Sequence, residues 1–399
     1  MILQKRNLIF CNIFILLVFL QERFIYLTDL SFVNIISICG IILLIGNIKN
    51  ITENNYYFKN IIILLMLVEV YGILISYFKY GQPISVGIIG IHYIFIYSFY
   101  FIIVDYYRNR DTDEFFKIIK KLFIVFGVFF SILLIIQTLI YPHELFKLSF
   151  SMRNGLRIQG CNILQYSFAV SVCDIISDYK RGKLLPFIIM GYALIFILQA
   201  RNVVLIFTPI LFYLLFVKVK NYQKKWFVVL LILSPFILFV IWKFGIDDMV
   251  AEIIYESRNI KGTGGVRVNE LNYYYKLLKD SNFLGIGILG DTFNLRKIIY
   301  GTVQGFYMED IGVSAFIFKT GIFGMLWYIL YLLKLVKVSK LTGGWIDILS
   351  TFIFLKTIFS FFFSVSFLFD FRDGLIYLVI LLALIDLNRY KKNNQEELT

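Results

Sequence analysis

Residues 118–141 read "IIKKLFIVFGVFFSILLIIQTLIY", and after the two lysines the run contains no charged residue. A helix of about 20 apolar residues is long enough to cross the hydrocarbon core of a bilayer. Lysines next to such a run are typical of the membrane surface. The stretch therefore predicts a transmembrane helix, and it sets the scale on which the rest of the chain is divided.

The whole chain has the composition of a polytopic membrane protein. Of the 399 residues, 59% are hydrophobic and 16% are charged, and the mean hydropathy is +0.79. The net charge of +13 comes from lysines and arginines that punctuate the apolar segments and form no single patch, so nucleic acid is not an expected partner. The four cysteines are spread through apolar segments, which indicates neither a disulfide framework nor a zinc site.

Apolar runs of similar length recur along the sequence and predict about twelve transmembrane helices. We therefore expect an all-α fold in which residues 1–399 form one integral membrane domain. The basic N-terminal stretch has no small-residue cleavage site and is interpreted as the start of the first span. The predicted spans are residues 7–26, 30–47, 60–78, 86–105, 118–141, 158–177, 184–200, 202–217, 226–246, 309–333, 346–366 and 371–388.

The distribution of lysine and arginine among the loops predicts that both termini are cytoplasmic. Two loops then lie on the outer face, residues 142–157 and residues 247–308, the second of them between the ninth and tenth helices. A loop as long as the second is usually functional or disordered, and its tyrosines and periodic leucines argue against disorder. No Gly/Pro-interrupted helices of the kind found in many secondary transporters are evident in the sequence.

The second loop contains "NFLGIGILGDTF" (residues 282–293), in which Gly285, Gly287 and Gly290 form a G-x-G-x-x-G pattern. That pattern indicates a dinucleotide only between a strand and a helix of a βαβ unit. Here Leu271, Tyr274, Tyr275 and Leu278 repeat at helical spacing before it, so a helix leads in and the dinucleotide interpretation fails. The remaining interpretations are turns, or a backbone that approaches a ligand and lines a cavity at Gly285 and Gly287.

Arginines are unusually frequent in the predicted outer segments. In a helix, Arg267 would share a face with Leu271, Tyr274 and Leu278, and an arginine on such a face favours an anionic partner. Guanidinium groups donate paired hydrogen bonds to phosphate oxygens, so a diphosphate suits this set, although interfacial arginines also hold lipid phosphates. The candidate diphosphate-binding arginines are Arg153, Arg157, Arg201, Arg258 and Arg267.

Glu309 and Asp310 begin the tenth predicted span. Acidic residues at a helix start are stabilised by the helix dipole, and one shielded carboxylate there is also a candidate general base. His92 is expected to be a hydrogen-bonded core residue, and His143 is a weaker candidate base.

Lys319 and Lys356 fall deep within predicted spans. Because an unpaired charge in hydrocarbon is costly, both should face the bundle, paired with acids or lining a polar cavity. The candidate partners are Glu69, Asp174 and Asp370.

Several features together resemble the bacterial O-antigen and capsular polysaccharide repeat-unit polymerases and the related O-antigen ligases. They are the dozen spans, "RNGLRIQGCN" before the sixth span, "QARNVVL" between the seventh and eighth, the Arg-led helix with "LGIG" in the long loop, and "KTGIFG" in the tenth span. The topology resemblance covers the whole chain, whereas the motif resemblance covers residues 153–324 and is loose.

The resemblance implies a GT-C-like, metal-independent glycosyltransferase without a cofactor, in the bacterial inner membrane. Its substrate would be an undecaprenyl diphosphate-linked oligosaccharide, with membrane lipid, a flippase and a chain-length regulator as further partners. Arg157, Arg201 and Arg267 match the family's arginines and would hold the diphosphate. Glu309 and Asp310 stand where the ligases carry a histidine, which favours a polymerase.

Tyrosines such as Tyr274 could stack on sugar rings, although interfacial aromatic belts explain many of them. Two other functions stay open from the sequence: a ligase that transfers finished glycan to another acceptor, and a transporter or flippase for a lipid-linked oligosaccharide. A structural scaffold would not need arginines on apolar helix faces.

Overall fold

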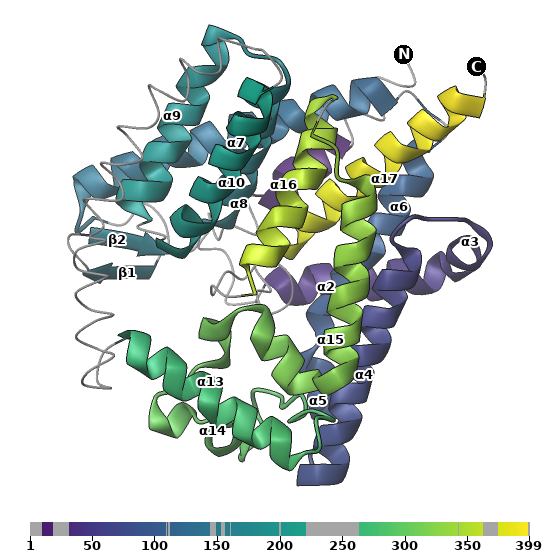
Figure 1. Ribbon diagram of the computed structural model, residues 1–399, viewed down its shortest axis with the longest axis vertical. Helices are drawn as coiled ribbons and strands as arrows, with labels where there is room; N and C mark the ends of the chain where they lie inside the picture. Colours follow the sequence, from purple (N-terminus) through teal and green to yellow (C-terminus); the bar gives the residue numbers. More distant parts are fainter. Residues whose placement is uncertain are drawn as a thin grey trace.

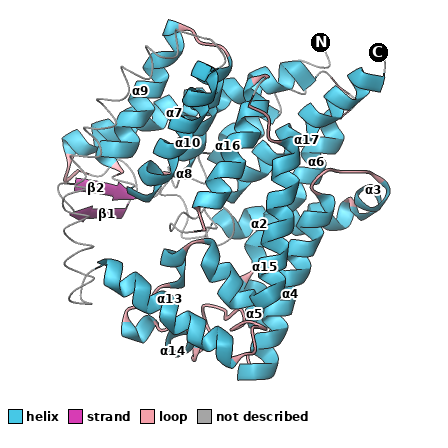
Figure 2. Ribbon diagram, viewed as in Figure 1, coloured by secondary structure: helices cyan, strands magenta, loops and turns pink. Residues whose placement is uncertain are grey.

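The computed structural model is a bundle of α-helices with one short β-hairpin (Figures 1 and 2). It describes residues 10–18, 32–108, 110, 112–143, 149–152, 156–159, 161–198, 201–220, 263–341, 343–361 and 374–397. Within these ranges, the side chains of residues 32–34, 149–157, 159, 201–205, 218–220, 263–267, 309–310 and 397 lie outside the described set.

The helices follow one another along the chain with short connections. The α-helices are α2 (Phe32–Gly46), α3 (Ile48–Glu53), α4 (Lys59–Tyr80), α5 (Ile84–Gly90), α6 (Ser98–Tyr107), α7 (Thr112–Ile140), α8 (Asn162–Ser177), α9 (Leu184–Tyr192), α10 (Arg201–Lys220), α13 (Thr263–Asp280), α14 (Arg296–Ile299), α15 (Val313–Val338), α16 (Trp345–Phe359) and α17 (Leu375–Glu397). The other helical turns are η1 (His92–Tyr97), η2 (Arg181–Lys183), the π-helical η3 (Ala193–Ile197), η4 (Thr302–Gln304) and η5 (Met308–Ile311). Strands β1 (Ser149–Met152) and β2 (Leu156–Gln159) pair antiparallel, with Ser151 opposite Arg157.

Among the described residues, α4, α7 and α15 are long and apolar enough to cross a membrane. They coincide with the spans predicted at residues 60–78, 118–141 and 309–333, although α15 begins only at Val313, after the 3-10 turn η5. The predicted span at 226–246 lies outside the described residues. The structure thus shows an all-helical, membrane-type fold.

The span predicted at residues 86–105 is not one helix. It consists of α5 and the continuous run η1–α6, which meet at a bend of 52° beside Gly90. Helix α15 is interrupted as well, because Gly321 has φ 64° and ψ −145° within it. The expectation that the chain has no interrupted helices was therefore wrong.

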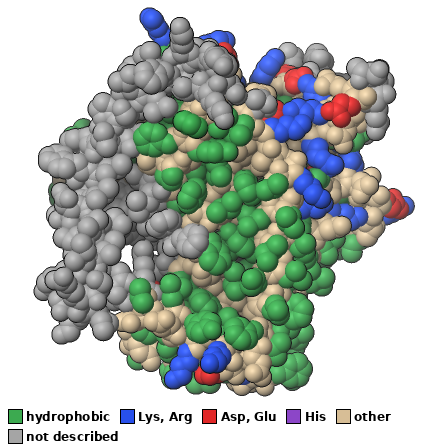
Figure 3. Space-filling view, viewed as in Figure 1, with side chains coloured by type: hydrophobic (Ala, Val, Ile, Leu, Met, Phe, Trp, Pro, Cys, Tyr) green, Lys and Arg blue, Asp and Glu red, His purple; other side chains and the backbone are tan. Residues whose placement is uncertain are grey.

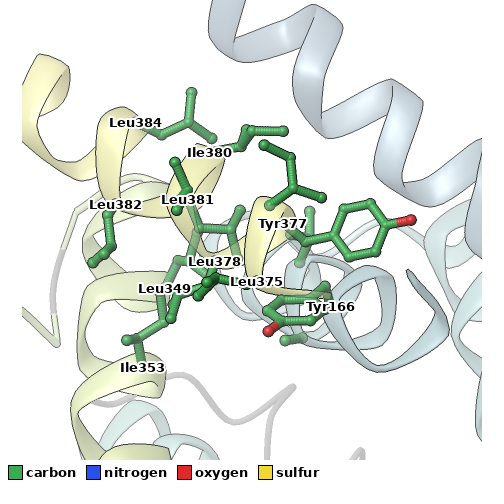
Figure 4. Close-up of a cluster of buried hydrophobic side chains, with 14 of the residues drawn as sticks. Tyr166, Leu349, Ile353, Leu375, Tyr377, Leu378, Ile380, Leu381, Leu382 and Leu384 are labelled. Carbon is green, nitrogen blue, oxygen red and sulfur yellow. The ribbon is translucent and has the colours of Figure 1, made fainter. Parts of the chain in front are cut away.

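The main hydrophobic core surrounds α17. From Leu375 to Leu387 the apolar side chains of this helix are all nearly inaccessible, and they pack against α6, α7, α8 and α16. Figure 4 shows part of this packing, with Tyr166 of α8 and Leu349 and Ile353 of α16 around Tyr377 and Leu378. A helix that is apolar on every side needs such enclosure.

A smaller hydrophobic cluster lies at the end of the bundle opposite the C-terminal end of α17 (Figure 1). Tyr274 and Leu278 of α13 pack there with Ile286, Tyr300 and other apolar residues that reach as far as Phe318 of α15. The described part of the predicted outer loop 247–308 therefore has a core of its own, and it rests on α4, α5 and α15.

Candidate functional site beside a glycine segment

Residues 283–290, here called the glycine segment, run between α4 and α15 as non-helical backbone. The amide nitrogens of Ile286 and Gly287 donate to the carbonyl oxygens of Phe318 and Lys319, each at 2.8 Å, and Ile288 donates to Gly72 at 3.0 Å. Buried backbone that is not helical must find partners of this kind. The segment is therefore a built part of the bundle and not a loose surface loop.

The break in α15 matches the glycine segment bond for bond. In an unbroken helix the amide of Ile322 would donate to Phe318, whereas here it donates to the carbonyl of Phe283 at 3.0 Å. The carbonyl of Phe318 accepts from Ile286 instead. Gly321 permits the exchange, because a Cβ atom there would lie 2.3 Å from the Phe283 oxygen.

The glycines of the segment are required by close backbone contacts. Gly285 has φ 115°, and a Cβ atom on it would lie 2.6 Å from the carbonyl oxygen of Lys319. Gly287 has φ 99°, and its Cβ atom would lie 2.4 Å from the hydroxyl oxygen of Ser76. Helix α13 leads into the segment, as the sequence predicted. The G-x-G-x-x-G spacing therefore reflects packing between the segment and two helices.

A cavity of about 290 Å³, here called the charged cavity, opens on one side of the glycine segment. Its wall includes both helix breaks: Gly90 at the bend after α5, and the turn of α15 that carries Lys319. The lining residues are Glu69, Gly90, Tyr93, Ile288, Leu289, Asp291, Arg296, Tyr300, Phe316 and Lys319.

Tyr300 organises the cationic side of the charged cavity. Its ring centroid lies 5.7 Å from the Arg296 guanidinium carbon and 5.8 Å from the Lys319 amine, within the range of a cation–π interaction. Its hydroxyl donates to the carbonyl of Gly287 and accepts from the amide of Leu289, each at 2.8 Å. The backbone of the glycine segment thus fixes the ring against which both cations lie.

Two acids balance these cations. Glu69 projects from α4 and is 2% exposed, whereas the Asp291 side chain is half-exposed and forms an ion pair with Arg296. The cavity consequently has a buried carboxyl group in its wall and an ion pair nearer to solvent. Its neutral balance of two cations and two acids, beside the rings of Tyr93, Tyr300 and Phe316, supplies hydrogen-bond donors, acceptors and ring faces. Those are the groups that recognise a polyhydroxylated ring.

An apolar groove of about 580 Å³ lies on the other side of the same segment. Leu284 and Gly285 line this groove, whereas Ile288 and Leu289 line the charged cavity. Hydrophobic side chains cover the adjacent face of the molecule along α4 and α15 (Figure 3), as suits a lipid environment. The remaining lining residues of the groove are Tyr71, Leu74, Ile75, Phe78, Lys79, Ser281, Asn282 and Phe323.

Tyr274 is fully buried, and its hydroxyl donates to the carbonyl of Tyr300 at 2.8 Å. It therefore supports Tyr300 from behind and does not line the charged cavity. The apolar face predicted for its helix was misplaced by one residue, because Leu271 is 40% exposed and Glu270 is buried. A carboxylate oxygen of Glu270 accepts from the amide of Tyr307 at 2.9 Å, which accounts for an acid on the inner face.

The predicted diphosphate-binding arginines and the predicted base are only partly located. Arg153 and Arg258 lie outside the described residues. Arg157 lies in β2, Arg201 begins α10, Arg267 lies in the first turns of α13, and Glu309 and Asp310 lie in η5, but their side chains lie outside the described set. The backbone of η5 contacts α13 and α15, which places it beside the smaller hydrophobic cluster. The roles of these residues stay predictions.

Two residues that the sequence singled out as buried charges, Lys319 and Glu69, share the wall of one cavity. The prediction that Lys319 lines a polar cavity is confirmed. Asp174 is not its partner, because Asp174 accepts from Lys120 at 2.7 Å and pairs with Lys183 at 3.1 Å. Lys356 lies 5.0 Å from the ring centroid of Phe207 in the main core, and Asp370 lies outside the described residues.

Sequence reasoning did not select Arg296 and Asp291, and it noted Tyr300 only as one of several loop tyrosines. No periodicity marks these residues, because the segment that carries them is made of short turns between α13 and η5. Their spacing Asp291–Arg296 gives no helix-face signal. Within the described part of the chain, no three His, Cys, Asp or Glu side chains are grouped as a metal site.

No protein-family model, curated protein or solved structure matches this chain.

Proposed function

We propose that the protein is a repeat-unit polymerase. It would join undecaprenyl diphosphate-linked oligosaccharides into a surface polysaccharide, on the outer face of the bacterial inner membrane. The observation that supports this proposal best is the pairing of the charged cavity with the apolar groove across one buried segment. A lipid-linked sugar has a polyhydroxylated part and a long hydrocarbon part, and the two sides of the glycine segment suit these two parts. In this proposal the chain has about twelve GT-C-like spans and cytoplasmic termini.

The proposed reaction is a displacement at the anomeric carbon of the donor sugar. The acceptor hydroxyl oxygen forms a bond to that carbon, while the bond from the carbon to the diphosphate oxygen breaks and its electron pair leaves on the lipid diphosphate. Arg296 and Lys319 are close enough to share the developing negative charge, since both lie against the ring of Tyr300. Arg153, Arg157, Arg201, Arg258 and Arg267 remain the further cations proposed for the diphosphate.

A carboxylate must take the proton that the acceptor hydroxyl loses. We assign this role to Glu69, because it is the buried acid in the wall of the charged cavity, whereas Asp291 is held by Arg296 nearer to solvent. Glu309 and Asp310 stay the alternative bases, since their backbone lies in η5 beside the same hydrophobic cluster.

A second candidate function is transport of a lipid-linked oligosaccharide across the membrane. The broken helices favour it, because α5–η1 and α15 are both interrupted where they border the charged cavity. Discontinuous helices around a central polar site are a feature of many secondary transporters. An O-antigen ligase, which uses another acceptor, is a third possibility within the enzyme class.

The test uses the purified full-length protein in nanodiscs with a lipid diphosphate-linked repeat unit and EDTA. The polymerase proposal expects a ladder of products on a gel, and expects Arg296→Gln to abolish it while Lys297→Gln leaves it intact. Lys297 is the matched control, because it neighbours Arg296, is exposed and does not line the cavity. Repeat units that cross a liposome bilayer without being joined would support the transporter and overturn the polymerase.

A further inference from the structure

Another cavity, of about 200 Å³, lies at the end of the bundle opposite the glycine segment. We call it the C-terminal pocket, because it is formed where α15 ends, α16 begins and α17 runs toward the C-terminus. Basic side chains gather toward this end of the molecule in Figure 3. The lining residues are Lys337, Val338, Lys340, Ile346, Asp347, Ser350, Ile385, Asn388, Arg389, Lys392, Asn393 and Glu396.

The buried acid of the pocket is neutralised by the protein itself. Asp347 is 6% exposed, and its carboxylate accepts from the Lys392 amine at 2.6 Å, from the Asn388 amide at 3.0 Å and from the Gly344 backbone at 3.0 Å. Lys392 and Asp347 therefore cancel as charges. Three cations, Lys337, Lys340 and Arg389, then face one carboxylate, Glu396, so the pocket carries excess positive charge.

Arg389 is held in position by an aromatic ring. Its guanidinium carbon lies 4.1 Å from the ring centroid of Tyr57, and the hydroxyl of Tyr57 donates to the carbonyl of Lys334 at 2.9 Å. Stacking of this kind leaves the edge of a guanidinium group able to donate paired hydrogen bonds. A preoriented arginine beside two exposed lysines is an arrangement that suits a phosphate group.

The ordinary explanation for basic residues at helix ends covers only part of this arrangement. Lys337 lies in the last turn of α15, where the helix dipole favours a cation. That effect does not account for Arg389 of α17, which reaches the same cavity from a different helix. Basic pockets between helix ends at a membrane surface are typical sites for anionic lipid headgroups.

We propose that the C-terminal pocket binds a phosphate group, through Lys337, Lys340 and Arg389. The phosphate can belong to the headgroup of an anionic phospholipid or to a free phosphate or pyrophosphate ion. This site is independent of the charged cavity and of the proposed polymerase activity. Because the pocket joins α15, α16 and α17, an anion bound there should also stabilise the contact among these helices.

The experiment measures binding and thermal unfolding of the full-length protein in two arms. One arm uses nanodiscs of phosphatidylcholine with increasing phosphatidylglycerol, and the other uses pure phosphatidylcholine nanodiscs with added phosphate or pyrophosphate. Saturable binding and a higher unfolding temperature in the first arm identify a lipid headgroup, and the same result in the second arm identifies a soluble phosphate. No saturable binding in either arm overturns the proposal.

Variants then locate the site. The double change Lys337→Gln/Lys340→Gln and the single change Arg389→Gln should each weaken binding about tenfold or more, because each removes charge-assisted hydrogen bonds to the phosphate. Lys117→Gln is the matched control, an exposed lysine of α7 outside the pocket. Arg389→Lys should restore part of the affinity if charge is what matters. Equal weakening by Lys117→Gln would show diffuse surface attraction and would overturn the site.

Discussion

The two ends of the helix bundle use charge differently. At the C-terminal end, charged side chains join helices directly: Asp174 of α8 accepts from Lys120 of α7 at 2.7 Å, and Asp347 of α16 accepts from Lys392 of α17 at 2.6 Å. At the other end the backbone of the glycine segment joins α4 to α15. There the charged side chains, among them Glu69 and Lys319, line a cavity.

This difference follows from the helix breaks. An intact helix consumes its own backbone hydrogen bonds, so neighbouring helices can be tied together only through side chains. Where α15 is broken at Gly321, its carbonyls accept from Ile286 and Gly287 and tie the glycine segment in place. The end that holds together through backbone can thus place acids and bases around a cavity, as a site that binds a polar substrate requires.

The largest effect is expected from a change in the glycine segment. Gly287→Ala places a methyl group 2.4 Å from the Ser76 hydroxyl oxygen at a residue with φ 99°. Backbone strain and steric overlap together should lower the free energy of unfolding by about 3 kcal/mol or more. Thermal unfolding in detergent, together with the product ladder, measures the loss of stability and of activity.

Two other glycines separate strain from overlap. Gly305 has φ 83° but no neighbouring atom within 4 Å, so Gly305→Ala should show strain alone and a smaller loss. Gly182 has open space and no positive φ, so Gly182→Ala should be nearly neutral. Equal effects at all three positions would contradict the claim that the glycine segment is specifically matched to α4.

The next effect concerns the chemistry of the charged cavity. Glu69→Gln keeps the size of the side chain but removes its ability to accept a proton. We expect the rate of glycosyl transfer to fall about 100-fold or more while the unfolding temperature stays near that of the wild type. The measurement is a time course of product formation, beside the same assay of Glu309→Gln. Full activity of Glu69→Gln with loss in Glu309→Gln would move the base to η5.

The long unbroken helices could be predicted from the sequence, because their apolar runs have the length of a membrane span. The core of α7 lies where the run at 118–141 placed it. The break after α5 could not be predicted, because hydrophobicity continues through Gly90 without interruption. What bends the chain there is contact with a distant residue: a Cβ atom on Gly90 would lie 3.3 Å from Gly290.

The charged cavity shows the same division. The cost of a buried charge predicted that Lys319 would face a polar site, and Glu69 was among its candidate partners. Composition could not choose Glu69 over Asp174, since that choice depends on which helices are neighbours. Arg296 and Tyr300 gave no signal because short turns, with no periodic face, bring them to the cavity.

A smaller loss is expected from the ionic contacts at the C-terminal end. Asp174→Asn removes the charge that Lys120 and Lys183 share, and both amines lie in a partly buried site where they are three-quarters covered or more. The free energy of unfolding should fall by about 2 kcal/mol, because two ammonium groups lose a charged acceptor. Glu53→Gln is the control: its pair with Lys49, at 4.0 Å, is exposed and should be worth a few tenths of a kcal/mol at most. Equal effects of the two changes would show that burial does not strengthen the Asp174 contacts.

The smallest effect is expected from the exposed neighbour of that site, Asp178. Hydrogen bonds from Lys180 and Lys183 hold the pKa of Asp178 below its usual value. A carboxyl group with a lowered pKa in the folded state contributes stability above its unfolded pKa, and that contribution is lost as the pH falls through the folded pKa. The effect should therefore be confined to pH values below about 4. Because Asp178 is fully exposed and screened by solvent, Asp178→Asn should leave the unfolding temperature at pH 7 almost unchanged. A large loss at pH 7 would mean that this end of the bundle depends on its surface ion pairs as well as on Asp174.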